Sequence, residues 1–83
     1  MTEQRGDVRA LVEQIAKSLV DDPAQVSVEQ IDEGDATVLE LTVAESDLGK
    51  VIGKSGRVAR AMRNLVNAAG IRAQKRFDLE ILE

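Results

Sequence analysis

The four residues Gly53-Lys54-Ser55-Gly56 constrain the fold most, because they break a run of otherwise helical spacing. Apolar residues before and after them recur at intervals of three and four, which predicts a short helix followed by a longer one. Two glycines around two polar residues permit backbone conformations that other residues disfavour. The sequence therefore predicts two helices joined by a tight, exposed turn. The apolar positions are Leu48, Val51 and Ile52 before the turn, and Val58, Ala61, Met62, Leu65, Val66 and Ala69 after it.

A further helix is predicted near the N-terminus, where apolar residues between Val8 and Val20 share the same spacing. Asp7 is a suitable N-cap for it. We expect Ser46 to cap the short helix before the glycine turn. We also expect Gly70 to end the long helix in a left-handed conformation, as glycine commonly does.

Alternating apolar residues predict three strands, near 26–28, 39–43 and 76–81. The turn-forming residues 32–35 lie between the first two strands and favour a hairpin. The element order is therefore α-β-β-α-α-β. We expect an α+β fold in which a three-stranded sheet has its helices packed on one face.

The composition bounds the domain count and the cellular setting. A chain of 83 residues supplies one core, so we expect a single domain over 1–83 in which only residues 1–6 fray. No signal-peptide pattern is present, and no apolar run approaches the ~20 residues that a membrane span needs. We expect a cytoplasmic protein with no membrane partner.

Catalysis and metal binding find little support in the residue types. The chain has no cysteine and no histidine, which excludes disulfides, thiolate metal sites and the usual general base and zinc ligand. The carboxylate clusters at 21–22 and 32–35 are typical of solvated helix ends and turns. We therefore expect no enzymatic activity, no cofactor and no metal site.

The charge is unevenly distributed, although the formal net charge is −4. Residues 1–47 hold three basic and twelve acidic side chains, and residues 77–83 hold three acidic side chains and no basic one. Between them, residues 48–76 hold eight basic side chains and no acidic one. This basic segment predicts a positive face suited to a polyanion.

The glycine turn lies inside the basic segment and has the features of a phosphate-binding loop. The helix that follows it directs free N–H groups and the positive end of its dipole at the turn. Lys54 adds a charge at the tip, Ser55 can cap the helix or donate a hydrogen bond, and Arg57 and Arg60 extend the positive surface. A nucleotide-binding P-loop does not fit, because the glycine required five positions before Gly53 is replaced by Leu48.

The turn and its flanks resemble a known signature. Residues 51–56 (VIGKSG) followed by 57–61 (RVARA) are similar to the Gly-x-x-Gly element of the KH domain, which clamps the backbone of about four RNA nucleotides. The element order is similar to the type II form of that domain. Residues 47–50, 67–69 and 75–81 further resemble the small bacterial single-domain KH proteins called KhpA.

The resemblance implies single-stranded RNA as the partner, and a role as post-transcriptional regulator or RNA chaperone. It also implies a homodimer and pairing with a larger KH-containing protein. Some of Leu48, Val51, Ile52 and Val58 are expected to line an apolar groove for unstacked bases, because a single aromatic residue offers no stacking platform. The predicted RNA-binding residues are Gly49, Lys50, Val51, Ile52, Gly53, Lys54, Ser55, Gly56, Arg57 and Arg60.

Two other readings remain open at this point. A KH fold acting mainly as a dimerisation or adaptor surface accounts for the same sequence. A helix-turn-helix that binds duplex DNA also has two helices around a glycine turn, although its first helix is normally longer.

Overall fold

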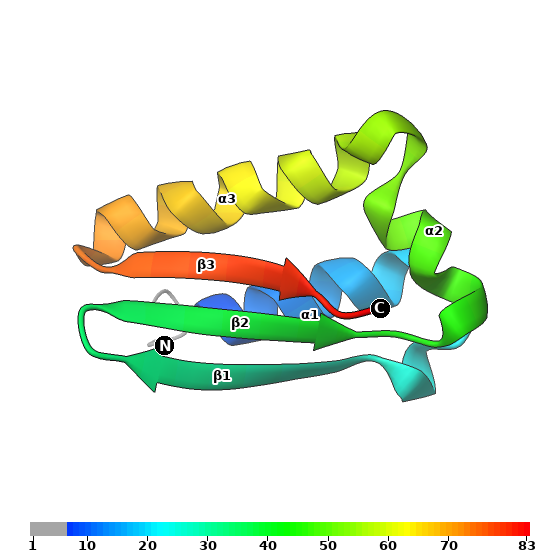
Figure 1. The fold of residues 1–83 in the computed structure, drawn as a ribbon, viewed down its shortest axis with the longest axis horizontal. Helices are drawn as coiled ribbons and strands as arrows, with labels where there is room; N and C mark the ends of the chain where they lie inside the picture. The colour runs from blue at the N-terminus through cyan, green and yellow to red at the C-terminus, as the bar shows by residue number, and fades with distance from the viewer. Residues whose placement is uncertain (1–6) are drawn as a thin grey trace.

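The helical and strand periodicities become three helices and three strands in the computed structural model, which describes residues 7–83 (Figure 1). The expectation that residues 1–6 fray falls outside the described residues. Short 3₁₀ turns occupy Pro23–Gln25, Glu45–Asp47 and Lys54–Gly56. The helices and strands are α1 (Val8–Leu19), β1 (Ser27–Glu33), β2 (Ala36–Thr42), α2 (Leu48–Ile52), α3 (Arg57–Ala73) and β3 (Arg76–Ile81).

The sheet has the strand order β1-β2-β3, so that β1 and β3 form its two edges. β1 and β2 are antiparallel and joined by a two-residue turn, in which Gly34 has a φ of 72°. β2 and β3 are parallel, because the chain crosses over through α2 and α3 between them. The predicted α+β fold and element order are confirmed.

One face of the sheet carries the core. α1 packs against β1 and β2, and α3 packs against β3 and α1, while Figure 1 shows that no element within residues 7–83 covers the other face. Leu39 and Leu41 in the central strand are fully buried against these helices. Val12 of α1, Val51 of α2 and Val66 of α3 are also fully buried, so all three helices contribute to one core.

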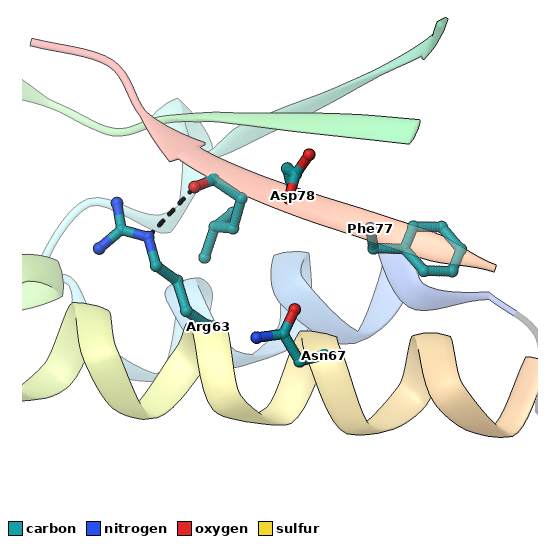
Figure 2. A pocket seen from close by; sticks show the side chains of 5 residues that line it. Arg63, Asn67, Phe77 and Asp78 are labelled. Carbon is teal, nitrogen blue, oxygen red and sulfur yellow. Dashed lines mark hydrogen bonds between the residues drawn. The ribbon is translucent and has the colours of Figure 1, made fainter. Parts of the chain in front are cut away.

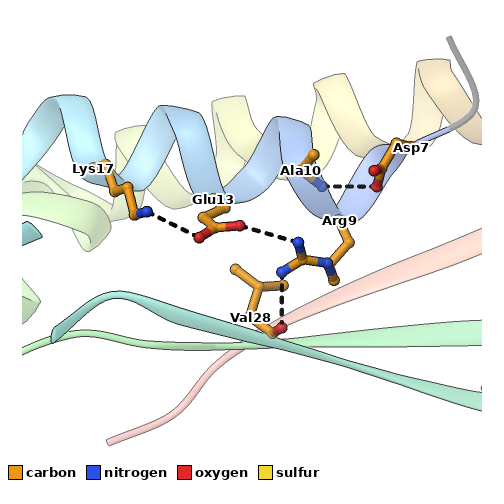
Figure 3. Close-up of polar contacts among 6 residues, drawn as sticks. All are labelled: Asp7, Arg9, Ala10, Glu13, Lys17 and Val28. Atoms are coloured by element: carbon orange, nitrogen blue, oxygen red, sulfur yellow. Dashed lines mark hydrogen bonds and ion pairs between the residues drawn. The ribbon is translucent and has the colours of Figure 1, made fainter. Parts of the chain in front are cut away.

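α1 begins where its sequence predicts, and a polar contact attaches it to the sheet. Asp7 accepts a hydrogen bond from the backbone N–H of Ala10 at 3.0 Å, which confirms it as the N-cap (Figure 3). Arg9 donates to the carbonyl of Val28 at 3.3 Å and pairs with Glu13 at 3.1 Å. These contacts attach the first turns of α1 to the edge strand β1.

Two predicted helix ends are wrong. Ser46 does not cap α2, because a 3₁₀ turn places Asp47 at the N-cap position instead. Gly70 does not end α3; the helix continues to Ala73, and Gln74 takes the left-handed conformation with a φ of 59°. Tertiary packing supplies the reason for a glycine at position 70.

Gly70 is buried where α3 meets the start of β3. A Cβ atom there would lie 2.6 Å from the carbonyl oxygen of Lys75 and 3.2 Å from Cδ2 of Phe77. The backbone N–H of Lys75 also donates to the carbonyl of Gly70 at 2.8 Å, which draws the two segments together. The short connection between α3 and β3 therefore depends on a residue without a side chain.

We predict opposite stability changes for two glycine-to-alanine substitutions in helices. Gly70→Ala should lower the free energy of unfolding by about 1–3 kcal/mol, since backbone must move to admit the methyl group. Gly49→Ala should raise it by about 0.5–1 kcal/mol, because a Cβ at Gly49 meets nothing within 4 Å and alanine favours the helix. Urea unfolding measures both, and a stabilised Gly70→Ala variant would contradict the packing described.

Candidate nucleic-acid interface

The turn between α2 and α3 has an unusual backbone. Gly53 has φ 79° and ψ 170°, a region that is nearly exclusive to glycine. Ser55 and Gly56 follow with φ values of 57° and 74°. A Cβ at Gly53 would lie 2.5 Å from Cγ2 of Val58, whereas one at Gly56 would meet nothing within 4 Å. Gly53 is thus required by both packing and backbone conformation, and Gly56 by conformation alone.

The side chains at the tip of the turn are exposed, and α3 begins without a side-chain cap. Of the two roles predicted for Ser55, capping α3 or donating a hydrogen bond, the first is therefore not observed. Its carbonyl oxygen instead accepts a hydrogen bond from Nη2 of Arg60 at 3.4 Å. The start of α3 consequently presents backbone N–H groups beside the exposed side chains of Lys54 and Ser55, an arrangement that suits an anion.

The predicted site residues divide by exposure. Gly49, Lys50, Lys54, Ser55, Arg57 and Arg60 are exposed, and Ile52, Gly53 and Gly56 are half-buried. Val51 is fully buried in the core, so its side chain holds α2 in place and is not available to a ligand. Of the predicted groove residues, Leu48 and Val58 pack against the core while partly exposed, and Ile52 lines a surface hollow.

Lys50, one of the predicted RNA-binding residues, forms ion pairs within the fold. Its ammonium lies 3.3 Å from Oδ1 of Asp47 and 3.4 Å from Oδ2 of Asp21. Because these carboxylates already pair with it, we leave Lys50 out of the proposed ligand contacts. Its hydrogen bond to Asp47, together with the charge of Asp21, raises the pKa of Lys50 above its usual value.

Asp47 is a structural residue that the sequence analysis did not identify. It is 1% exposed, and its carboxylate accepts hydrogen bonds from the backbone N–H groups of Asp21 at 3.2 Å and Asp22 at 3.1 Å. Burial acts to raise the pKa of Asp47, but these donors and the Lys50 ammonium outweigh it and leave the pKa below its usual value. The ionised carboxylate therefore ties the chain after α1 to the start of α2.

A groove runs between α3 and the edge strand β3. Near the turn, a hollow of about 280 Å³ is lined by residues of α2, α3 and the C-terminal end of the chain. A second hollow of about 130 Å³ lies farther along the same two elements (Figure 2).

Arg63 lines both hollows, and the sequence analysis did not single it out. The first hollow is lined by Ile52, Gly56, Ala59, Arg60, Arg63, Ile81 and Glu83. The second is lined by Arg63, Asn67, Phe77, Asp78 and Leu79. In the sequence, the spacing of three between Arg60 and Arg63 was the available signal that both lie along one side of α3.

Charge is separated between the two sides of the molecule. Within residues 7–83, Lys54, Arg57, Arg60 and Arg63 have no carboxylate within ion-pair distance. On the uncovered sheet face, Glu29, Glu40 and Glu80 stand in register across the three strands. Although the chain has a formal net charge of −4, the turn and the exposed side of α3 are therefore positively charged.

Loss of the Asp47 charge should destabilise the fold in acid. An ionised carboxylate with a lowered folded pKa contributes stability above its usual pKa of 3.8, and that contribution is lost as the pH falls through the folded value. The Asp47→Asn variant should therefore have a lower melting temperature than the parent at pH 7. The difference between the two melting temperatures should shrink as the pH drops below about 4. Melting temperatures of both proteins from pH 2 to 7 measure this; a pH-independent difference would contradict it.

The fold has counterparts among solved structures. Aquifex aeolicus Era bound to GDP·AlF4⁻ superposes with a TM-score of 0.64 over 98% of this chain, at 18% identity, and the match covers 31% of the Era chain. A complex of Era with MgGDPNP and nucleotides 1506–1542 of 16S ribosomal RNA superposes with a TM-score of 0.62 over 96% of this chain, at 18% identity and 30% of that chain. These similarities concern the fold alone.

Sequence relatives match at much higher identity. The protein named RNA-binding protein KhpA in Clostridium acetobutylicum is 47% identical over 90% of this chain and 100% of its own length. Its namesake in Caldanaerobacter subterraneus is 50% identical over 87% of this chain and 96% of its own length. The namesake in Borreliella burgdorferi is 45% identical over 94% of this chain and 95% of its own length.

These relatives are named for RNA binding and not for a reaction that they catalyse, in agreement with the expectation of no enzymatic activity. No helix within residues 7–83 has the length and apolar character required to cross a membrane.

The family model described as KhpA/KhpB, KH domain, matches residues 9–81, and the element order and glycine turn are those expected of that domain. The chain therefore belongs to the KhpA/KhpB family of KH domains.

Proposed function

We propose that the chain binds single-stranded RNA, with backbone phosphates at the Gly53–Gly56 turn and bases in the groove between α3 and β3. The observation that carries this proposal is the position of the turn. Lys54, which has no ion-pair partner among residues 7–83, and the uncapped start of α3 lie beside the groove, and Gly56 belongs to both the turn and the groove. Names of the relatives, each an RNA-binding protein KhpA, support it.

The groove favours unstacked bases over a stacked strand. Phe77 is the only aromatic residue, and it is 6% exposed, so no aromatic platform is available for base stacking. Contacts to bases must come from Ile52, Ile81 and polar side chains such as Arg60. A single KH unit reaches about four nucleotides, so we expect weak binding by one chain.

Duplex DNA is the less suitable ligand. A helix-turn-helix lays its second helix in the major groove and needs that helix free of neighbours along its reading side. Here β3 runs beside α3, and Arg63 of α3 donates a hydrogen bond to the carbonyl of Leu79 on that strand at 3.3 Å. We therefore infer that RNA is the ligand. On the resemblance to KhpA proteins, we further propose that the chain acts in the cytoplasm as a post-transcriptional regulator or RNA chaperone.

Self-association is a second proposed activity, and exposed apolar side chains on α3 favour it. Leu65 is 51% exposed and Ile71 is 77% exposed. Leu65 lies about 200° around the helix from Arg63 and faces away from the groove, whereas Ile71 lies about 80° from Arg63 and belongs to another side of α3. A dimer formed around Leu65 would leave both grooves open, and the same surface suits a larger KH-containing partner.

The turn can be tested by reversing its charge. Lys54→Asp with Ser55→Asp places negative charge where we propose that phosphates bind, while exposed acidic residues suit the N-terminal end of α3. We expect the free energy of unfolding to change by no more than about 1 kcal/mol and the affinity for a single-stranded RNA to fall more than about tenfold. The variant should also show a shallower salt dependence than the parent, because it makes fewer phosphate contacts.

A matched control exists on α1, where Lys17-Ser18 repeats the same dipeptide on an exposed surface. Lys17→Asp with Ser18→Asp imposes the same change in net charge away from the turn. It should retain RNA binding within about threefold, since only long-range repulsion acts. A folded turn variant that binds RNA as tightly as this control would refute the proposed site, and equal or tighter binding of duplex DNA by the parent would refute the choice of ligand.

The dimer surface can be tested with Leu65→Glu. The side chain is exposed in the monomer, so the fold should tolerate the change, whereas a charged residue in an apolar contact should abolish that contact. Sedimentation should show a dimer for the parent and a species near 9.0 kDa for the variant. Leu11→Glu, at a 39% exposed position on α1, should remain dimeric. A parent that sediments as a monomer at all concentrations would exclude this surface.

A further inference from the structure

Arg63 occupies the middle of the groove, where the two hollows meet. It lies one turn after Arg60 on α3, and its side chain reaches across to β3. Its Nε donates a hydrogen bond to the carbonyl oxygen of Leu79 at 3.3 Å (Figure 2). Among the arginines of α3, Arg63 alone donates a hydrogen bond to a strand. Leu79 thereby fixes the orientation of the guanidinium.

The rest of that guanidinium is unused. A guanidinium carries five N–H donors, and the Nε–H is the one engaged by Leu79. Within residues 7–83, neither Nη group of Arg63 takes part in a hydrogen bond or an ion pair, although Asp78 and Glu83 line the adjoining hollows. Figure 2 shows both Nη groups directed away from the Leu79 carbonyl. The groove therefore contains an oriented planar fork of donors without an acceptor.

A fork of this kind matches two acceptor atoms that lie side by side. Guanine offers O6 and N7 as such a pair, and cytosine offers O2 and N3. Adenine places an amino donor beside N7, and uracil places its N3–H donor between its two carbonyl oxygens. The geometry of the fork thus separates guanine and cytosine from adenine and uracil.

We propose that Arg63 recognises one base of the bound RNA. Its two Nη groups would donate hydrogen bonds to guanine or cytosine, and the site would discriminate against adenine and uracil. This inference rests on the proposed RNA-binding function and adds base selectivity to it. A phosphate also matches the fork, but Lys54 and Arg57 supply positive charge at the turn, whereas Arg63 lies deeper along the groove against β3. The base contact is therefore the role that its position favours.

The test compares four five-nucleotide RNAs of uridines that differ only at the central base. The parent should bind the RNA with a central guanine or cytosine about tenfold more tightly than those with adenine or uracil. Arg63→Lys keeps the charge but loses the planar fork, so discrimination should fall below about twofold while the affinity for the all-uridine RNA changes little. Arg72→Lys, the same change at an exposed position near the end of α3, should leave the parent's preference intact.

A second measurement needs no substitution. The Nε–H resonance of Arg63 in ¹⁵N NMR spectra of the parent should shift on addition of the preferred RNA and shift less with the all-uridine RNA. The inference is overturned if the parent shows no base preference or if the Arg63→Lys variant keeps the parent's preference. It is also overturned if the variant loses affinity by the same factor for every RNA, which is the result expected of a phosphate contact. Failure of the parent to bind any of the RNAs would instead refute the proposed function itself.

Discussion

The buried carboxylate of Asp47 is the interaction on which the placement of the turn depends. α2 has only five residues, and a helix of that length is not stable by itself. Two contacts hold it: Val51 packs in the core, and Asp47 binds the backbone N–H groups of Asp21 and Asp22 while pairing with Lys50. The first half of the chain thus fixes where α2 begins. The position of the turn then follows, because it starts one residue after α2 ends.

Downstream of that anchor, close packing replaces hydrogen bonding as the constraint. Gly53 turns the chain so tightly that its α-carbon faces the backbone N and side chain of Val58, which leaves no space for a methyl group. At the other end of α3, Gly70 allows Lys75 and Phe77 the same close approach. α3 is therefore held close to its neighbours at both ends. Between these ends, the buried side chains of Met62 and Val66 and the hydrogen bond from Arg63 to Leu79 hold it beside β3.

Local patterns predicted the elements well and their tertiary roles poorly. Apolar spacing and the Asp7 cap depend on neighbours within a few residues, so the α+β order, the turn and the start of α1 could be predicted. Gly70, Asp47 and Lys50 owe their roles to partners far along the chain or packed beside it, such as Asp21, and no short-range pattern reveals those partners. For Arg63, the spacing of three from Arg60 indicates a shared side of α3, but it does not reveal the carbonyl of Leu79, which lies on another element.

The contacts of the basic segment also change how its charge acts. Lys50 and Arg76 count as positive charges in the sequence, but both have acidic partners in the structure. Lys50 pairs with Asp47 and Asp21, and Nε of Arg76 lies 3.5 Å from Oδ2 of Asp78. The charge that remains unpaired is concentrated at the turn and along α3, so a bound strand meets it over only a few nucleotides. Few phosphate contacts give weak binding by one chain. If two chains join through α3 as we propose, the pair would present two such grooves at a high effective concentration, so affinity and selectivity for longer RNAs would come from the assembly more than from the single domain.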